Sequence, residues 1–116
     1  MKKFCLVYGG DSLEAEISIL TALKVQKELE KFSYPYMMVY LDHDGNFYTG
    51  KSLLFKTNYT HLTKFKKGNF EKNNQHYYFK TKFKKEEFDV VMYNLKSITS
   101  SRFIISLGSF FIISYI

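Results

Sequence analysis

Short hydrophobic runs and one long amphipathic segment alternate in the first third of the chain. The run from Phe4 to Tyr8 stops at Gly9-Gly10, which predicts a short buried strand followed by a turn. Residues 12–32 repeat apolar side chains at helical spacing, and Asp11 or Ser12 can cap this helix. The predicted sheet-facing stripe of the helix consists of Ser18, Thr21, Ala22, Val25, Leu29 and Phe32.

A second apolar run follows from Tyr36 to Leu41 and predicts another strand. Residues 42–46 have the composition of a turn, and Phe47 to Thr49 predict a short returning strand. Strand, helix and strand in this order form a unit with parallel strands and a right-handed crossover. We therefore expect an α/β fold, with a small, mostly parallel sheet and flanking helices.

The segment 51–87 differs in composition from the rest. Between Lys51 and Lys85 there are ten lysines and one acidic residue, Glu71, with aromatic residues interleaved. We expect a short helix at residues 52–55, then an irregular or hairpin insertion with a strand at 76–79, and a buried strand at 88–93. The chain is interpreted as one domain, 1–116, with a βαβ unit at 1–50, an insertion at 51–87, a strand at 88–94 and an atypical apolar tail at 95–116.

Composition adds few functional clues. The net charge is +6, but Arg102 is the single arginine beside many lysines, phenylalanines and tyrosines, as AT-rich codon usage would produce. Cys5 lies in the first apolar run and is expected to be a buried structural thiol. No apolar stretch is long enough to span a membrane, so a cytoplasmic location is expected. The three histidines, His43, His61 and His76, lack metal-ligand spacing, and no metal site is predicted.

The candidate chemistry lies where the first strand meets the helix. Gly9 and Gly10 would lie at the carboxyl edge of a parallel sheet, where open α/β folds bind ligands, and glycine permits close backbone approach. On a helical wheel Glu14 lies about 40° from Ser18, at the N-terminal tip of the sheet-facing stripe. Its carboxylate would face the crevice and could bind an ammonium group. Alternatively Glu14 closes a capping box with Asp11, and the two roles can coexist.

The spacing in this segment resembles a known family. The pattern G-G-x-S-x-E-x-E-I-S is similar to the opening motif of D-alanine–D-alanine ligases, and later D-x-D-G and F-D-V-V segments also match, so the resemblance covers about residues 3–94. It implies the Rossmann-like N-terminal, pre-ATP-grasp domain of a bacterial enzyme that joins two D-alanines for peptidoglycan, using ATP and magnesium. The first motif is matched by Gly9, Gly10, Ser12, Glu14, Glu16, Ile17 and Ser18.

The resemblance also implies roles for these residues. Glu14 would hold the ammonium group of the first D-alanine. Gly9, Gly10 and Ser18 are also assigned to the substrate-binding site, with Ser18 as a close-packing or hydrogen-bonding partner. Glu16 is expected to be structural. We expect no catalytic residue in this chain, and the ATP and magnesium of the family would not be bound by it. D-Alanine would bind weakly or not at all to this domain alone.

The match to the family stops after Val91. Where the family continues with His-Gly and a Glu-Asp-Gly loop, this chain has Tyr93 to Thr99 without a histidine, and no ATP-grasp domains follow. One hypothesis is a product truncated or frame-shifted after about residue 94, and an alternative is a diverged protein whose tail forms the last strand. The chain is therefore expected to be inactive alone.

Two other function classes stay open. A second apolar strip on the helix, away from the sheet, would be covered by missing ligase domains, by a second copy in a homodimer, or by the insertion. This strip consists of Leu13, Ile17, Leu20 and Leu23. It could make the chain a non-catalytic interaction module. The lysines and aromatics between Phe55 and Phe83 could instead bind a single-stranded nucleic acid, but the single arginine and the lack of a binding motif argue against this.

Overall fold

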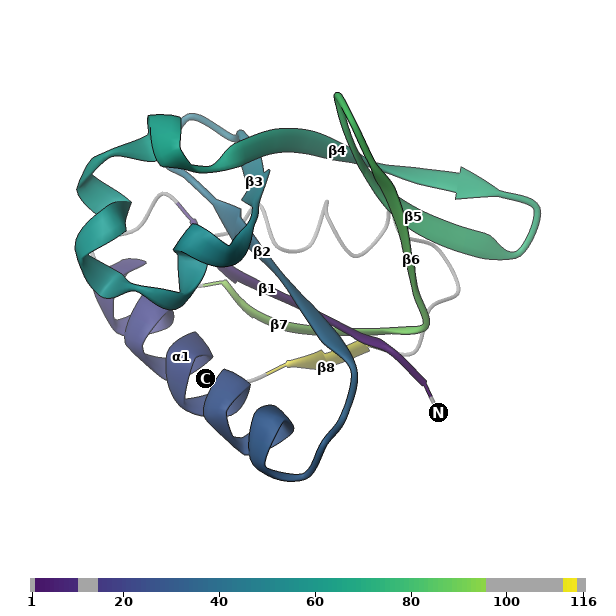
Figure 1. The fold of residues 1–116 in the computed structure, drawn as a ribbon, viewed down its shortest axis with the longest axis horizontal. Coiled ribbons are helices and arrows are strands. Elements are labelled where there is room, and N and C mark those ends of the chain that lie inside the picture. Colours follow the sequence, from purple (N-terminus) through teal and green to yellow (C-terminus); the bar gives the residue numbers. More distant parts are fainter. Residues whose placement is uncertain (1, 11–14, 96–111, 115–116) are drawn as a thin grey trace.

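The computed structural model describes residues 2–10, 15–95 and 112–114. Figure 1 shows the elements in chain order. These are β1 (Phe4–Gly9), α1 (Ala15–Lys31), β2 (Tyr36–Leu41), β3 (Phe47–Thr49), the 3-10 helices η1 (Lys51–Leu54), η2 (Lys56–Thr60) and η3 (Leu62–Lys64), β4 (Lys66–Asn73), β5 (His76–Thr81), β6 (Lys85–Phe88), β7 (Val90–Leu95) and β8 (Ile112–Ser114).

Within the described residues, all strands belong to one eight-stranded sheet in the order β6-β5-β4-β3-β2-β1-β7-β8. β1 lies between β2 and β7 and is parallel to both, with Phe4 opposite Tyr36 on one side and Val90 on the other. The strands from β2 outward to β6 pair antiparallel instead. The α/β prediction is thus confirmed, while the sheet is larger and more mixed than a mostly parallel one, because the insertion adds antiparallel strands to it.

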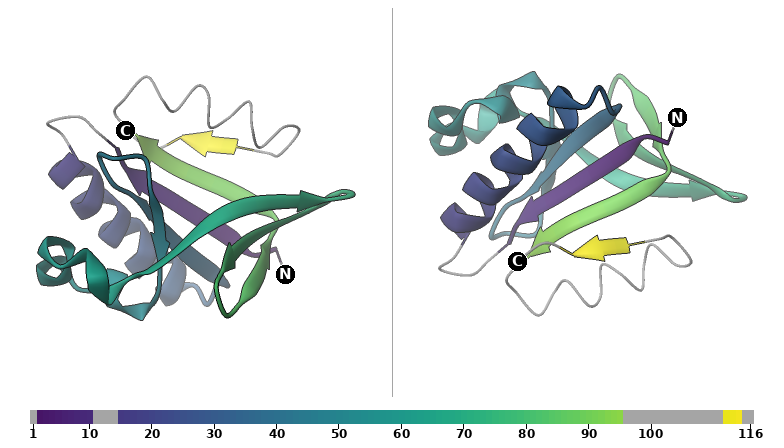
Figure 2. Two further views of the ribbon diagram at one scale, coloured as in Figure 1. Left: turned by 90° about the horizontal axis from the view of Figure 1, so that it is seen from above. Right: turned by 90° about the horizontal axis from the view of Figure 1, so that it is seen from below.

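Helix α1 crosses one face of the parallel strands (Figures 1 and 2). Ser18, Ala22 and Leu29 of the predicted stripe are buried, as expected for the side that covers the sheet. Phe32 is an error in that prediction, since the helix ends at Lys31 and the Phe32 side chain is 61% exposed. Ser33, at φ 60, already has left-handed backbone that turns the chain toward β2. The predicted cap at Asp11, Ser12 and Glu14 lies outside the described residues.

The sheet carries a hydrophobic core on each face because successive strand side chains point to opposite sides. Under α1, Leu6 and Tyr8 pack with Ile19, Ala22 and Met92. On the other face, β5 and β6 fold back over the sheet, as Figure 2 shows, and their aromatic residues pack on β1, β2 and β7. That second cluster contains Cys5, Val7, Met37, Val39, Leu41, Tyr77, Phe79, Phe88 and Val91.

The insertion is folded rather than irregular. Residues 51–64 form three short 3-10 helices, which includes the predicted turn of helix near residue 52. β4 and β5 then form a hairpin, and the predicted strand at 76–79 is confirmed as part of β5. The single strand expected at 88–93 is wrong in its limits, because Phe88 ends β6 and a separate strand, β7, begins at Val90.

The tail contributes one short strand among the described residues. β8 pairs in parallel with β7, with Val91 opposite Ile112. This agrees with the alternative in which the tail forms the last strand of the domain. The other tail residues, 96–111 and 115–116, lie outside the described part of the chain.

Candidate functional site

The backbone requires glycine at Gly9, the last residue of β1, and at Gly10, the first residue of the loop that follows. Gly9 has φ 105 and Gly10 φ 107, values that side chains with a Cβ rarely adopt. A Cβ on Gly9 would lie 2.2 Å from the carbonyl oxygen of Leu41 and 2.8 Å from the ring of Tyr40. The Gly10 amide donates a hydrogen bond of 2.9 Å to that same Leu41 oxygen. The Gly-Gly turn is therefore held tightly against the carboxyl end of β2.

Ser18 fixes the same turn from the helix. Its side chain is fully buried, and its Oγ accepts a hydrogen bond of 2.9 Å from the Gly9 amide. The predicted pair of Gly9 and Ser18 is thus brought together, in an arrangement where the hydroxyl contacts the backbone of the loop.

Of the two glutamates in the G-G-x-S-x-E-x-E-I-S motif, Glu16 belongs to the described residues, in the first turn of α1. Glu14, the predicted substrate ligand, lies outside the described residues. Glu16 is exposed and its carboxylate lies 3.2 Å from the Lys56 ammonium group, so it links α1 to η2 at the surface. This agrees with the structural role expected for Glu16.

Sequence reasoning missed a buried tyrosine cluster next to this loop. Tyr8 immediately precedes Gly9 and is fully buried, and its hydroxyl is hydrogen-bonded to the Tyr59 hydroxyl of η2. Tyr59 in turn donates a hydrogen bond of 2.6 Å to the Leu53 carbonyl, and its ring packs edge-on against Tyr40. Burial raises the pKa of Tyr8 and of Tyr59 well above the ordinary tyrosine value, so both hydroxyls stay protonated.

No local sequence signal connects these tyrosines, because Tyr8 and Tyr59 are 51 residues apart and belong to different elements. The contact depends on η1 to η3 folding back over the end of the sheet near α1, which Figure 1 shows. The cluster therefore packs next to the Gly-Gly turn and links the insertion to β1.

A family model described as D-ala D-ala ligase N-terminus matches residues 3–96, which is most of the chain and includes the whole Gly-Gly turn. The chain belongs to this family. A D-alanine–D-alanine ligase from Staphylococcus saprophyticus is 44% identical over 41 residues, an alignment that covers 35% of this chain and 12% of that enzyme.

Solved structures share the fold of this ligase N-terminal domain. The Coxiella burnetii D-alanine–D-alanine ligase superposes with a TM-score of 0.74 at 19% identity, covering 91% of this chain and 33% of that one. The VanG D-Ala:D-Ser ligase from Enterococcus faecalis gives a TM-score of 0.73 at 16% identity, covering 96% and 35%. The chain thus spans about a third of the length of these structural relatives.

The second apolar strip of the ligase N-terminal domain is partly covered by its own insertion. Leu23 packs with the core under α1, which also contains Leu53, Tyr59 and Leu62 of the insertion. Ile17 and Leu20 remain 57% and 40% exposed. Leu13 lies outside the described residues. The insertion therefore leaves Ile17 and Leu20 exposed, and a partner domain or a second copy of the chain stays the candidate that would cover them.

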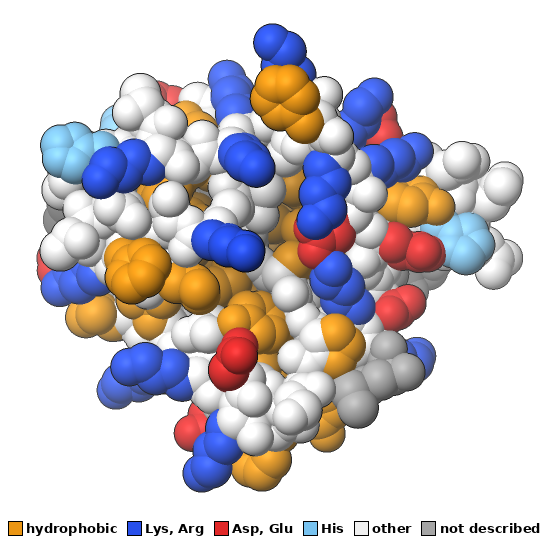
Figure 3. Space-filling model, in the orientation of Figure 1, with side chains coloured by type: hydrophobic (Ala, Val, Ile, Leu, Met, Phe, Trp, Pro, Cys, Tyr) orange, Lys and Arg blue, Asp and Glu red, His pale blue; other side chains and the backbone are white. Residues whose placement is uncertain are grey.

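The lysine- and aromatic-rich insertion uses most of its aromatics in the core of the domain. Phe65, Tyr77 and Phe79 are buried, whereas Phe55 and Phe83 are largely exposed. Lysines stand out across the face in Figure 3, mixed with hydrophobic side chains. Lys72 and Lys85 lie over the rings of Tyr77 and Tyr78, so these rings are already occupied. This arrangement disfavours a row of free stacking platforms for nucleic-acid bases.

Cys5 and two of the histidines, His43 and His76, have surroundings that are typical of structural residues. Cys5 is fully buried, and burial raises the pKa of its thiol well above the ordinary value, which disfavours the reactive thiolate. His43 is exposed beside Asp44, and His76 bonds to Glu87 on the neighbouring strand. Across residues 2–10, 15–95 and 112–114, no helix is long and apolar enough to cross a membrane.

Proposed function

We propose that this chain is the substrate-side N-terminal domain of a cytoplasmic D-alanine–D-alanine ligase, acting in ATP-dependent dipeptide formation for peptidoglycan precursors. The observation that carries the proposal is the family match over residues 3–96, which includes the buried Gly-Gly turn at the carboxyl edge of the parallel strands. Ligands of open α/β folds bind at this edge.

In this proposal the domain positions the first D-alanine. The Leu41 oxygen and the Ser18 hydroxyl hold the turn at Gly9 and Gly10 in one conformation, so a ligand there meets a preorganised backbone. Glu14, four residues before Ser18 in the sequence, supplies the carboxylate for the ammonium group of the first D-alanine. Ser18 would act through the loop rather than on the substrate.

ATP and magnesium would supply the activation of a D-alanine carboxylate in the complete family enzyme. Among the described residues no three His, Cys, Asp or Glu side chains gather as a metal site. We propose that ATP and magnesium bind to the other domains of the family enzyme. Because the chain spans about a third of its structural relatives, we propose that turnover requires the ATP-grasp domains.

A phosphate-release assay tests the expected dependence on other domains. With ATP, magnesium and D-alanine, the isolated chain should release no more phosphate than a blank. Clear D-alanine-dependent release by the chain alone would contradict its role as a partial, substrate-side domain, although it would strengthen the ligase assignment.

A chimera tests the substrate role. Residues 1–95 would replace the corresponding domain of the Staphylococcus saprophyticus ligase, and circular dichroism would check folding. We expect D-alanine-dependent phosphate release, lowered at least about 100-fold by Glu14→Gln because a charge-assisted contact in the site is lost. The matched control, Glu16→Gln, changes an exposed carboxylate and should keep activity within about twofold. Equal activity of both variants would remove Glu14 from the site.

A second candidate function is an interaction module, which the exposed Ile17 and Leu20 favour. In this case the chain would dimerise through that side of α1 without catalysis. Light scattering at several protein concentrations would test it, and a strictly monomeric species would exclude it.

A further inference from the structure

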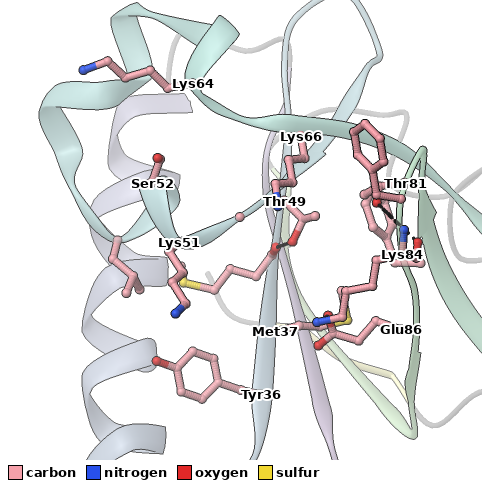
Figure 4. A pocket seen from close by; sticks show the side chains of 15 residues that line it. Tyr36, Met37, Thr49, Lys51, Ser52, Lys64, Lys66, Thr81, Lys84 and Glu86 are labelled. Atoms are coloured by element: carbon pink, nitrogen blue, oxygen red, sulfur yellow. Dashed lines mark hydrogen bonds and ion pairs between the residues drawn. The ribbon is translucent and has the colours of Figure 1, made fainter.

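A pocket of about 630 Å³ opens beside β2, away from the Gly-Gly turn. Figure 4 shows it between η1, the first half of β2 and the turn that joins β5 to β6. Tyr36, at its lower end, is opposite Phe4 in the sheet, whereas Gly9 is opposite Leu41. Five residues of strand separate these two levels, or about 16 Å. Because none of Gly9, Gly10 and Ser18 lines the pocket, it is distinct from the described part of the candidate substrate loop.

The pocket exists because the sheet is incomplete at this point. β3 pairs with β2 through Tyr40 and Leu41, and then Gly50, at φ 126, turns the chain away into η1. In the described part of the chain, Tyr36 to Val39 therefore have no strand neighbour on that side. The Thr49 hydroxyl donates to the Met38 carbonyl at 2.8 Å, which closes part of this edge. The remaining space is bordered by side chains of η1, β4 and the β5–β6 turn.

Positive charge dominates the lining. Four lysines, Lys51, Lys64, Lys66 and Lys84, border the pocket together with a single acid, Glu86. In Figure 4, Lys51 extends above the ring of Tyr36 and Lys66 reaches down beside Thr49, while Lys64 points away.

The acid offsets the charge of Lys84 but not that of Lys51 or Lys66. Glu86 is already bound by Lys3 and lies 3.3 Å from Lys84. Lys51 and Lys66 form no ion pair with any described residue. An anion in the pocket would therefore meet two uncompensated ammonium groups that belong to different elements.

Besides Thr49, Ser52 and Thr81, the rest of the lining is largely apolar, and part of it is shielded from water. Met37, Met38 and Phe79 are buried at 6%, 5% and 1% exposure, and Leu54 and Phe83 flank them with exposed side chains. A mostly apolar cleft of this volume with a few convergent polar groups is typical of small-molecule sites. Lysine-rich composition explains the number of lysines, and the fold places two of them, from different elements, beside one largely apolar cavity.

We propose that this pocket binds a small anionic molecule whose phosphate or carboxylate group contacts Lys51 and Lys66 and whose apolar body packs on Met37, Met38 and Phe79. The proposal is independent of the ligase function, because it uses no residue of the Gly-Gly turn.

Proton–nitrogen NMR titrations of the full chain test it with four probes. These are 1-naphthyl phosphate, 1-naphthoate, the neutral 1-naphthol and inorganic phosphate. We expect at least one naphthyl anion to shift the amides of residues 36–38, 49–52 and 66, with at least about tenfold higher affinity than 1-naphthol or inorganic phosphate. The two anions separate phosphate from carboxylate recognition. Shifts confined to other parts of the chain, or equal affinity for 1-naphthol, would overturn the proposal.

A charge-matched pair of variants identifies the lysines. Lys51→Met/Lys66→Met should weaken the naphthyl anion at least about tenfold, and raising the salt concentration should weaken binding to the wild type. Lys24→Met/Lys27→Met removes the same charge from the exposed side of α1 and should leave the affinity within about twofold. The NMR spectrum of each variant reports whether it is folded. Equal weakening in both pairs would show an effect of net charge only and would refute the site.

Discussion

At the scale of single residues, the turn after β1 depends on the missing side chain of Gly9. Gly9→Ala should lower the free energy of unfolding by about 3 kcal/mol, because strain at positive φ adds to a clash with the Leu41 oxygen. Gly45→Ala is the matched control, since Gly45 has φ 86 but open space around its Cβ position, and should cost about 1 kcal/mol. Urea unfolding would measure both, and equal losses would contradict the close approach.

The Ser18 hydroxyl supports a second residue-scale prediction. Ser18→Ala leaves the buried Gly9 amide without its acceptor and should cost about 1–3 kcal/mol of unfolding free energy. The amide resonances of Gly9 and Gly10 should also shift. Thr60→Ala, which removes an exposed hydroxyl, should cost less than about 0.5 kcal/mol in the same urea experiment. A loss as small for Ser18→Ala would show that this bond does not hold the turn.

At the scale of elements, the hydrogen bond between Tyr8 and Tyr59 links η2 to β1. Tyr59→Phe removes the partner of the Tyr8 hydroxyl and the donor to the Leu53 carbonyl, so we expect a loss of about 1–3 kcal/mol in urea unfolding at neutral pH. Tyr34→Phe changes an exposed ring and should have little effect. Similar stability of the two variants would contradict a fastening role.

The same pair makes stability depend on alkaline pH. Burial raises the folded-state pKa of Tyr8 and Tyr59 above 10.0, so their contribution is complete below pH 10 and is lost as the pH rises further. The wild type should therefore lose stability progressively above pH 10, followed by circular dichroism. Tyr59→Phe should show a shallower dependence, since one buried phenol no longer titrates.

Glu86 links β6 to Lys3, just before β1, and this ion pair should make the stability of the protein depend on pH in the acidic range. Burial alone would raise its pKa, but the hydrogen bonds and charges of Lys3 and Lys84 outweigh this and hold the pKa below 4.5. Its stabilisation is therefore present above pH 4.5 and is lost as the pH falls through the lowered value. Glu86→Gln should cost about 1 kcal/mol at pH 7, with a smaller difference from the wild type at pH 3.

Urea unfolding at both pH values would check this, with Glu28→Gln on the exposed side of α1 as the control. A difference between wild type and Glu86→Gln that is as large at pH 3 as at pH 7 would contradict the ion pair as its origin.

Elements with local signals were predictable from the sequence, and those that depend on distant contacts were not. The runs at Tyr36–Leu41 and Phe47–Thr49 and the glycine turn after β1 have hydrophobic period or turn residues within a few positions. The limits of β6 and β7 were missed because Lys85–Phe88 has a charged pattern and owes its strand to pairing with β5. The contact of Tyr8 with Tyr59 and the lysine-lined pocket arise only when the insertion folds back.

At the scale of the whole molecule, substitutions on the exposed apolar side of α1 should affect the assembly of domains more than the stability of this domain. Ile17→Glu/Leu20→Glu should lower the free energy of unfolding by no more than about 1 kcal/mol, because these side chains are already 57% and 40% exposed. If this side receives the ligase domains, the double variant should lower the activity of the chimera at least about tenfold. Lys24→Glu/Lys27→Glu provides the control on the same helix. Unchanged chimera activity would place the domain contact elsewhere.

The outer strand β6 has a consequence for the behaviour of the protein at high concentration. It is only four residues long, reads Lys-Glu-Glu-Phe, and its Glu86 is engaged by Lys3 and Lys84. An incoming strand from another molecule would have to strip water from these charges before it gained any backbone hydrogen bonds. The charged edge strand β6 should therefore disfavour edge-to-edge association of this aromatic-rich sheet into fibres.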